Sequence, residues 1–306
     1  MRLAVPDLIS PSYFPAIAAV ELGLGRDEGV DLELELRFPV TEAAEALRAG
    51  EIDFLACAAH APLAAFPDWV GAKLLVALSQ NTYWFLVVRS DLGVRRGDVR
   101  ALDGLRIGAA PGPDQALLQL LGDAGVNLKE RGIEVGPIPG VDGESTSFGV
   151  VAAEALAERR VDAFWANGMG AEVAVRNGTG VVVMDVRRGD GPRGASSYTF
   201  PALATTEAMI ARRPAAVKSA VRAVVAAQAA LRTDPGRAAG VGRRLFPTME
   251  ADLIADLIER DAPYYEPRIT EQAVNALTGF TMRAGLLSAA VSYEDVVATP
   301  FSGLWT

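Results

Sequence analysis

Part of this chain occurs twice in the sequence. The segment 43–62 reads AAEALRAGEIDFLACAAHAP, and the segment 152–171 reads AAEALAERRVDAFWANGMGA. The run Ala-Ala-Glu-Ala-Leu recurs unchanged 109 positions later, and Asp53 aligns with Asp162 at the same spacing. Each copy has the pattern of a helix end, a charged turn, a buried strand and a loop of small and polar residues. Two such blocks that face one another form a cleft, and clefts between domains bind ligands.

A second, shorter repeat precedes each copy. The run Arg-Leu-Ala-Val-Pro at 2–6 resembles Arg-Ile-Gly-Ala-Ala-Pro at 106–111, and in both places a short apolar strand leads into a loop and then a helix. We therefore predict an α/β protein of two domains, each a mixed sheet flanked by helices, with a cleft between them. The length of 306 residues fits this organisation, because domains usually hold about 100–200 residues.

Pattern and turn signals divide the chain into strands and helices. Residues 30–38 alternate apolar and charged side chains, which is typical of a half-buried strand. Pro113 and Pro214 each suit the first turn of a helix. Further strands are predicted at 2–5, 53–57, 74–79, 83–88, 134–138, 161–165 and 181–185, and helices at 41–48 and 150–158.

The order of these elements predicts where the domains divide. We assign residues 1–85 and 204–306 to domain 1, and residues 90–195 to domain 2, inserted between them. Two strand-like crossings, at 84–90 and 196–203, are the expected hinge.

Composition excludes several classes of protein. The net charge of −9 argues against nucleic acid or an anionic membrane as partner, since both attract a basic surface. No apolar run is long enough to span a bilayer, so we expect no membrane insertion. Cys57 is the only cysteine, which excludes an internal disulfide and a multi-cysteine metal site. We expect no metal and no cofactor.

The N-terminal residues bear on localisation. Met1 and Arg2 lead directly into a predicted strand, without the apolar segment and small-residue cleavage site of a secretory leader. We expect a periplasmic or extracytoplasmic protein if a leader was removed, and a cytoplasmic one if Met1 is the native start. A monomer is expected in either case.

Two segments and the order of elements resemble a known family. Leu-Asp-Gly-Leu-Arg-Ile-Gly at 102–108 and Val-Asp-Ala-Phe-Trp at 161–165 resemble type II periplasmic solute-binding proteins. The most similar group includes sulfonate, nitrate and thiamine-precursor binding proteins and the yeast pyrimidine synthase of thiamine biosynthesis. The resemblance implies the periplasmic-binding-protein type II fold. It also implies a substrate-binding protein that captures a small organic molecule by domain closure for the permease of an ABC-type importer.

The resemblance implies a ligand site at the loops that follow strands in both domains. Aromatic side chains there would form planar walls, and Asp7 with Asp114 would grip an ammonium or hydroxyl group from both sides, although Asp114 also suits a helix cap. Trp165→Ala is expected to weaken binding by about 1–3 kcal/mol with the fold intact. The predicted ligand contacts are Asp7, Ser10, Ser12, Tyr13, Thr41, Ala59, His60, Trp84, Gly112, Asp114, Trp165, Asn167 and Tyr198.

An enzyme on the same fold is the alternative, because a desulfinase, some decarboxylases and the yeast synthase resemble it too. His60 matches a histidine of the yeast enzyme, but Ala56 stands where that enzyme has the lysine that holds its pyridoxal cofactor. The alternative is therefore a cytoplasmic enzyme that uses His60 and Cys57 as base and nucleophile. A ligand-sensing domain of a larger regulator is a third reading. The loop with Arg187, Arg188 and Arg193 is expected to be solvated.

Overall fold

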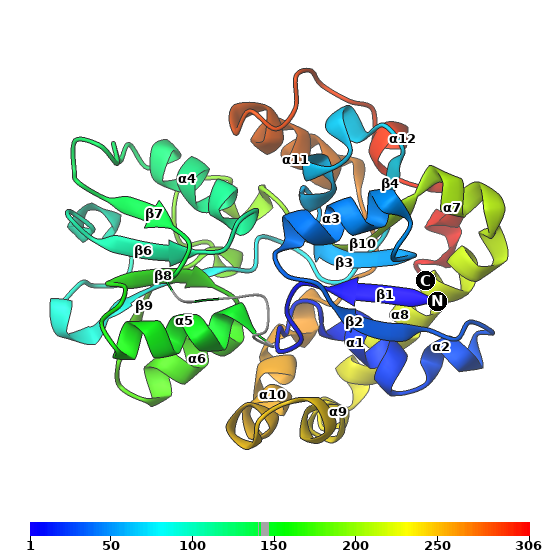
Figure 1. Ribbon diagram of the computed structural model, residues 1–306, viewed down its shortest axis with the longest axis horizontal. Coiled ribbons are helices and arrows are strands. Elements are labelled where there is room, and N and C mark those ends of the chain that lie inside the picture. The colour runs from blue at the N-terminus through cyan, green and yellow to red at the C-terminus, as the bar shows by residue number, and fades with distance from the viewer. Residues whose placement is uncertain (140, 142–146) are drawn as a thin grey trace.

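The structure, a computed structural model, describes residues 1–139, 141 and 147–306, which form two lobes side by side (Figure 1). The first lobe is built around a five-stranded sheet in the order β2-β1-β3-β10-β4, and the second around one in the order β7-β6-β8-β5-β9. The strands of the first lobe are β1 (Arg2–Val5), β2 (Glu33–Leu36), β3 (Phe54–Ala58), β4 (Ala72–Ala77) and β10 (Pro201–Thr206). Those of the second are β5 (Phe85–Arg89), β6 (Arg106–Ala109), β7 (Glu134–Gly136), β8 (Ala163–Ala166) and β9 (Gly180–Asp185).

The two sheets have the same topology. In the first, β1 pairs in parallel with β2 and β3, and β10 runs antiparallel between β3 and β4. In the second, β6 pairs in parallel with β7 and β8, and β5 runs antiparallel between β8 and β9. The repeated strands β3 and β8 therefore hold equivalent central positions. The carboxyl ends of parallel strands carry the ligand loops of open α/β sheets, so this topology directs attention to the loops after β1, β3, β6 and β8.

Helices cover both sheets. In the second lobe these are α4 (Pro113–Asp123), α5 (Phe148–Ala157) and α6 (Gly168–Arg176). In the first lobe, α8 (Pro214–Thr233) packs on α1 (Phe14–Glu21) and buries the predicted apolar face that contains Val217, Val221 and Val224. The remaining helices are α2 (Leu24–Asp27), α3 (Val40–Ala49), α7 (Glu207–Arg212), α9 (Arg237–Leu245), α10 (Thr248–Asp261), α11 (Glu271–Arg283) and α12 (Tyr293–Val296).

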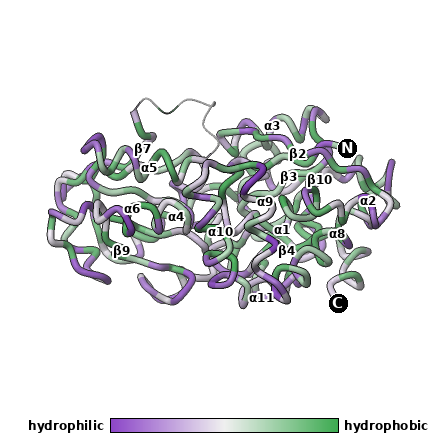
Figure 2. The backbone as a smooth tube through the Cα atoms, turned by 90° about the horizontal axis from the view of Figure 1, so that it is seen from below, coloured by the Kyte–Doolittle hydropathy of each residue, from purple (hydrophilic) through white to green (hydrophobic). Residues whose placement is uncertain are grey.

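Hydropathy follows this layering. In Figure 2 hydrophilic segments lie mainly along the outer loops of both lobes, and hydrophobic segments run through the interior. The C-terminal residues return to the first lobe, where the Trp305 indole N–H donates to the Leu75 carbonyl at 3.0 Å. In the described ranges 1–139, 141 and 147–306, no helix has both the length and the apolar character needed to cross a membrane.

The chain passes between the sheets twice. The first passage joins β4 to β5 through residues 78–84, and the second joins β9 to β10 through residues 186–200. The segments predicted as hinge strands overlap β5 and β10, which lie within the two sheets, and a 3-10 turn occupies Ala195–Ser197 instead of extended chain. The domain limits set from the sequence stay a prediction.

The predicted α/β class with two mixed sheets is confirmed. The main difference lies at residues 30–38, where the ladder to β1 covers only Glu33–Leu36. β2 is an edge strand that pairs only with β1, and residues 30–32 and 37–38 lie outside this ladder.

Candidate functional site

A cavity lies where the two lobes meet. Its wall combines the loop after β1, the start of α3, the first chain passage, the loop after β6, and the starts of α5 and α6. The lining residues are Pro6, Asp7, Ser10, Tyr13, Phe38, Val40, Tyr83, Trp84, Ala110, Pro111, Pro113, Phe148, Trp165, Ala166 and Asn167. The cavity volume of about 40 Å³ is small, because pockets for drug-sized ligands hold about 300–1,000 Å³.

Asp7 is the charged residue of this lining. Its carboxylate is buried and accepts hydrogen bonds from the backbone N–H of Ile9 at 2.8 Å, the Ser147 hydroxyl at 3.0 Å and the Asn167 amide at 2.8 Å. Burial raises the pKa of Asp7 to about 6, although these bonds and one from the Gly149 backbone act in the opposite direction. Asp7 thus joins the first lobe to the second through donors that are all neutral.

The donors that face Asp7 are fixed by helix caps. The Asn167 side-chain carbonyl accepts from the backbone N–H groups of Met169 at 2.9 Å and Gly170 at 3.3 Å, which caps α6. Because its oxygen is engaged there, the amide N–H₂ of Asn167 is the end that faces Asp7. Ser147 caps α5 in the same way, by accepting from Val150. The sequence therefore places one polar side chain at each helix start, and both point into the interface between the lobes.

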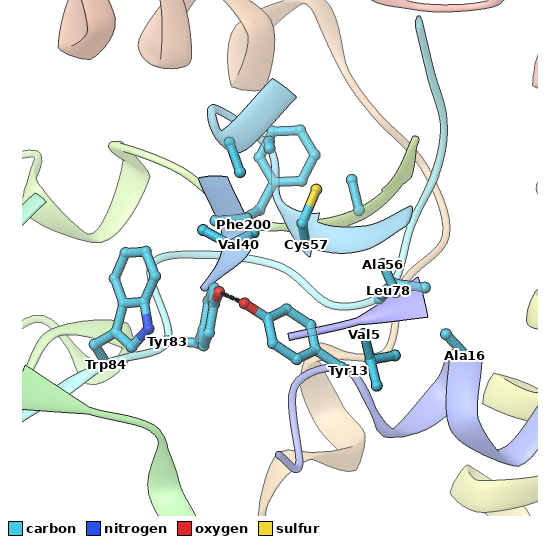
Figure 3. Close-up of a cluster of buried hydrophobic side chains, with 14 of the residues drawn as sticks. Val5, Tyr13, Ala16, Val40, Ala56, Cys57, Leu78, Tyr83, Trp84 and Phe200 are labelled. Carbon is cyan, nitrogen blue, oxygen red and sulfur yellow. Dashed lines mark hydrogen bonds between the residues drawn. The ribbon is translucent and has the colours of Figure 1, made fainter. Parts of the chain in front are cut away.

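Aromatic side chains form the rest of the wall. Trp84 lies between Tyr83 and Trp165, with ring centroids 4.4 Å and 5.8 Å away. The Trp165 indole N–H donates to the Pro113 carbonyl at 3.1 Å, and its side chain is fully buried. Figure 3 shows the hydroxyl groups of Tyr13 and Tyr83 directed toward one another, where they hydrogen-bond. Among the described residues, the site is thus a largely aromatic chamber with one carboxylate, that of Asp7.

His60 contacts the second lobe instead of lining the cavity. Its Nε2 donates to the Gly112 carbonyl at 3.2 Å, which leaves Nδ1 to accept from the Thr199 hydroxyl at 3.1 Å. Burial lowers the pKa of His60 to about 4, so the ring is neutral near pH 7. Gly112 has φ +96°, and a side chain there would meet Val40 at 2.6 Å. The hydrogen bond from His60 to Gly112 and the close approach of Gly112 to Val40 place the loop after β6 against the first lobe.

Cys57 lies in the hydrophobic interior. Figure 3 shows it close to Ala56, Val40 and Phe200, and its side chain is fully buried. Burial raises the pKa of the thiol well above its ordinary value, and a thiol without thiolate character is a poor nucleophile. Among the hydrogen bonds of the described residues, none joins Cys57 to His60. The predicted base-and-nucleophile pair is therefore not assembled in this structure.

The expectation that Arg187 is solvated is wrong. Its guanidinium forms a buried ion pair with Asp261 at 2.8 Å and donates to the hydroxyls of Ser79 at 2.9 Å and Ser12 at 3.2 Å. It also lies 4.9 Å from the centre of the Tyr264 ring. Arg187 belongs to the second chain passage and its partners to the first lobe, so this cluster joins the passage to that lobe, outside the cavity lining.

The structure brings together six of the residues predicted to contact a ligand: Asp7, Ser10, Tyr13, Trp84, Trp165 and Asn167. The others are placed outside the cavity lining. Asp114 accepts from the Gly112 N–H at 2.9 Å within the turn before α4, and Ser12 pairs with Arg187. The Tyr198 hydroxyl bonds Asp123. Thr41 lies within α3, Ala59 is buried beside β3, and Gly112 and His60 contact one another. Ligand contact by each of these residues stays a prediction.

Sequence reasoning missed several lining residues. Among them are Phe38 and Phe148, which stack across the two lobes with centroids 6.0 Å apart. Both are single phenylalanines outside the repeated segments, so the sequence gave no signal of a site there. Ser147, which holds Asp7, could have been found as the helix cap before the repeated helix. In the described part of the chain, no group of His, Cys, Asp or Glu side chains is placed to hold a metal ion.

Comparison with known proteins supports this architecture. The family model described as "NMT1/THI5 like" matches residues 10–238. A search of curated proteins found no significant match. Among solved structures, the periplasmic nitrate-binding protein NrtA from Synechocystis PCC 6803 is 14% identical, with 99% of this chain and 86% of that chain covered at a TM-score of 0.75.

Two further structures extend the comparison. The alkanesulfonate-binding protein SsuA from Xanthomonas axonopodis pv. citri, bound to MOPS, is 16% identical over 98% of this chain and 96% of that chain, with a TM-score of 0.69. A mutant of DszB in complex with biphenyl-2-sulfinic acid is 20% identical over 99% of this chain and 97% of that chain, with a TM-score of 0.66. At these identities the likeness establishes the fold.

Proposed function

The chain belongs to the NMT1/THI5-like family, and on that premise we propose that it is the solute-binding protein of an ABC-type importer. One observation carries the proposal: two lobes of equal topology direct their strand ends to a shared cavity. Solved structures with this fold include proteins named for nitrate and alkanesulfonate binding. The proposed partners are one small organic molecule and a membrane permease, and the proposed location is extracytoplasmic.

Capture would proceed by closure of the lobes. The contacts that span them are short and specific: Asp7 to Asn167, His60 to Gly112, and Arg187 to Asp261. The cavity beside these contacts holds about 40 Å³, less than the pockets that take organic ligands. A solute would therefore enter while the lobes are apart, and it would be shielded from water when they close. We assign the hinge to the two chain passages, residues 78–84 and 186–200, near the predicted crossings.

The proposal is tested by a solute screen followed by scattering. Thermal shift across sulfonates, nitrate, pyrimidines, aromatic acids and amines should reveal a stabilising solute. A ligand at 100 times its Kd adds about 2.7 kcal/mol to the free energy of unfolding. Small-angle scattering should then show a smaller radius of gyration with the solute than without it. A tightly bound solute that leaves the radius unchanged would contradict closure.

The same screen separates a receptor from the enzyme alternative. A receptor returns its solute chemically unchanged, which mass spectrometry of the released solute would show. His60→Ala should weaken binding in a receptor, because it removes the contact with Gly112, but it should abolish turnover in an enzyme. Ser219→Ala, at a half-buried position on α8 of the first lobe and outside the cavity lining, is the control. Conversion of the solute by the wild type would replace the receptor proposal with the enzyme one.

A further inference from the structure

We propose that the solute carries a cationic nitrogen group, a protonated amine or amidine, on a flat apolar body, and that Asp7 receives this group. The inference rests on the proposed solute-binding function and adds the charge and shape of the ligand. It is carried by the combination of one buried carboxylate with aromatic walls in the same cavity.

Within the described part of the chain, the cavity lining supplies no counter-ion to the carboxylate of Asp7. Of the described residues that line it, Asp7 is the sole charged one, and none is Lys, Arg or His. Its partners, Ile9, Ser147 and Asn167, donate from neutral groups. Buried charges in proteins are usually paired with an opposite charge or bound to a metal. A cationic ligand would supply the missing charge.

The positive groups near Asp7 in the described part of the chain do not act as its counter-ion. Asp7 lies at the starts of α5 and α6, whose N-termini carry partial positive charge. This partial charge and the neutral donors do not compensate for burial, since the pKa of Asp7 stays raised at about 6. Arg187 is held by Asp261 and by two serine hydroxyls outside the cavity lining. Near neutral pH the cavity therefore presents a carboxylate without a full counter-charge.

The same charge opposes an anion. Two like charges about 4 Å apart at an effective dielectric constant of about 20 repel strongly enough to weaken binding by roughly 1,000-fold. An anionic solute would thus require Asp7 to be protonated or to leave its place between Ser147 and Asn167. The solved structures named for nitrate and alkanesulfonate binding share the fold, but this cavity has the opposite electrostatic character to one suited for anions.

The walls suit a flat cation. Trp84 and Trp165 have ring centroids 5.8 Å apart, and Phe38 and Phe148 stack across the lobes. Aromatic faces attract cations and cover flat apolar rings. The amidinium or ammonium group of the solute would bind the Asp7 carboxylate. Its apolar body would extend into the cavity and lie against these rings as the lobes close.

The test uses three probes of similar shape and different charge. Benzamidinium is cationic, benzamide is neutral and benzoate is anionic. Titration calorimetry with the full chain near pH 7.5 should give wild-type binding in the order benzamidinium, benzamide, benzoate. Asp7→Asn should weaken benzamidinium binding by about 10- to 100-fold, the usual loss for a hydrogen bond to a charged group, and should change benzamide binding by less than about 3-fold.

Asp31→Asn is the control, because it changes the net charge equally at an exposed position. It should leave all three affinities unchanged, and thermal melts should show that both variants fold. Benzoate binding to the wild type as tightly as benzamidinium would overturn the charge assignment and leave the solute-binding proposal standing. Unchanged benzamidinium binding in Asp7→Asn, or no binding of any probe, would also overturn it. The broader solute screen and the scattering experiment decide the underlying function separately.

Discussion

The two lobes share one topology, and at the ends of their strands away from the cavity they also share chemistry. The Asp53 carboxylate accepts from the backbone N–H of Arg2 at 2.9 Å. In the second lobe, the Asp162 carboxylate accepts from the backbone N–H of Arg106 at 3.0 Å. In each case the aspartate before the repeated strand ties that strand to the start of its parallel neighbour. The two copies of the sequence repeat thus use the same aspartate hydrogen bond to join neighbouring strands.

At the cavity ends the two lobes differ. Trp165 in β8 corresponds in the repeat to Ala56 in β3, and both are fully buried. After β1 the chain carries Asp7, whereas Pro111 stands at the corresponding place after β6. The first lobe therefore supplies the charge, and the second supplies the bulk and the neutral donors. The two lobes therefore share the aspartate bonds that join their strands, and they differ at the residues that face the shared cavity.

The largest effect is expected where the lobes differ most in volume. Trp165→Ala gives the second lobe the residue of the first, and it should lower the free energy of unfolding by about 3–5 kcal/mol, as for other large buried side chains. The burial of Trp165 thus revises the expectation of an intact fold with an effect on binding alone. Urea unfolding and titration with the screened solute would measure both effects.

Trp69→Ala provides the comparison for this variant. Trp69 is also buried, but it lies in the first lobe away from the cavity lining. Both variants should lose stability, and only Trp165→Ala should lose solute affinity beyond the fraction that is unfolded. Equal affinity in the two folded variants would show that Trp165 serves the core alone.

Much of this fold could be predicted from the sequence, because its elements carry local signals. Period-two and helical patterns located the repeated strands and helices, and proline marked the starts of α4 and α8. The loops after β1 and β8 were predicted to hold site residues, and Asp7 and Asn167 do line one cavity. Their common location follows from the topology, which places strand ends together, and their contact with a ligand stays a prediction.

The parts that were missed depend on contacts between distant segments. Arg187 stands in a glycine- and arginine-rich stretch that is typical of a solvated loop, but its partner Asp261 is 74 positions away on another helix. The stacking of Phe38 on Phe148 across the lobes is likewise a product of docking. No local pattern encodes such pairs, so only the assembled structure reveals them.

The next effect concerns Asp7, the charged residue that the first lobe contributes to the described cavity lining. The pKa of Asp7 is raised from 3.8 to about 6, so the folded chain holds this proton more tightly than the unfolded chain. The contribution of Asp7 to the free energy of unfolding is therefore most favourable below about pH 4, and it is lost as pH rises to about 6. Asp7→Asn should remove that loss and raise the free energy of unfolding at neutral pH by about 1–3 kcal/mol.

Urea unfolding at several pH values between about 4 and 7 would show whether the variant has a flatter profile than the wild type. A stabilised variant that no longer binds a cationic solute would mark Asp7 as a residue kept for binding at the expense of stability. A variant that is less stable than the wild type at neutral pH would instead make Asp7 a structural link between the lobes.

A smaller effect tests the chemistry that the lobes share. Burial opposes the ionisation of Asp162, but hydrogen bonds from Arg106 and the charges of Arg106 and Arg89 outweigh it and lower its pKa. The stabilisation from Asp162 is therefore present at neutral pH and is lost as pH falls through its folded pKa. Asp162→Asn should cost about 1–2 kcal/mol near pH 7. Asp53→Asn should cost about half of that, since among the described residues no arginine side chain pairs with Asp53, whereas Arg89 and Arg106 pair with Asp162. Equal losses, measured by urea unfolding, would mean that the backbone bond alone sets the effect.

The smallest effect is expected at Cys57, whose counterpart in the repeat is Ala166. Cys57→Ala gives the first lobe the residue of the second and removes one sulfur atom from a fully buried site. It should cost about 1 kcal/mol or less and should leave solute affinity unchanged, because Cys57 lies outside the cavity lining. The native thiol should also resist alkylation by iodoacetamide until urea unfolds the chain, since burial keeps it protonated. Rapid alkylation of the folded protein, or loss of solute conversion in this variant, would restore Cys57 as a nucleophile and with it the enzyme alternative.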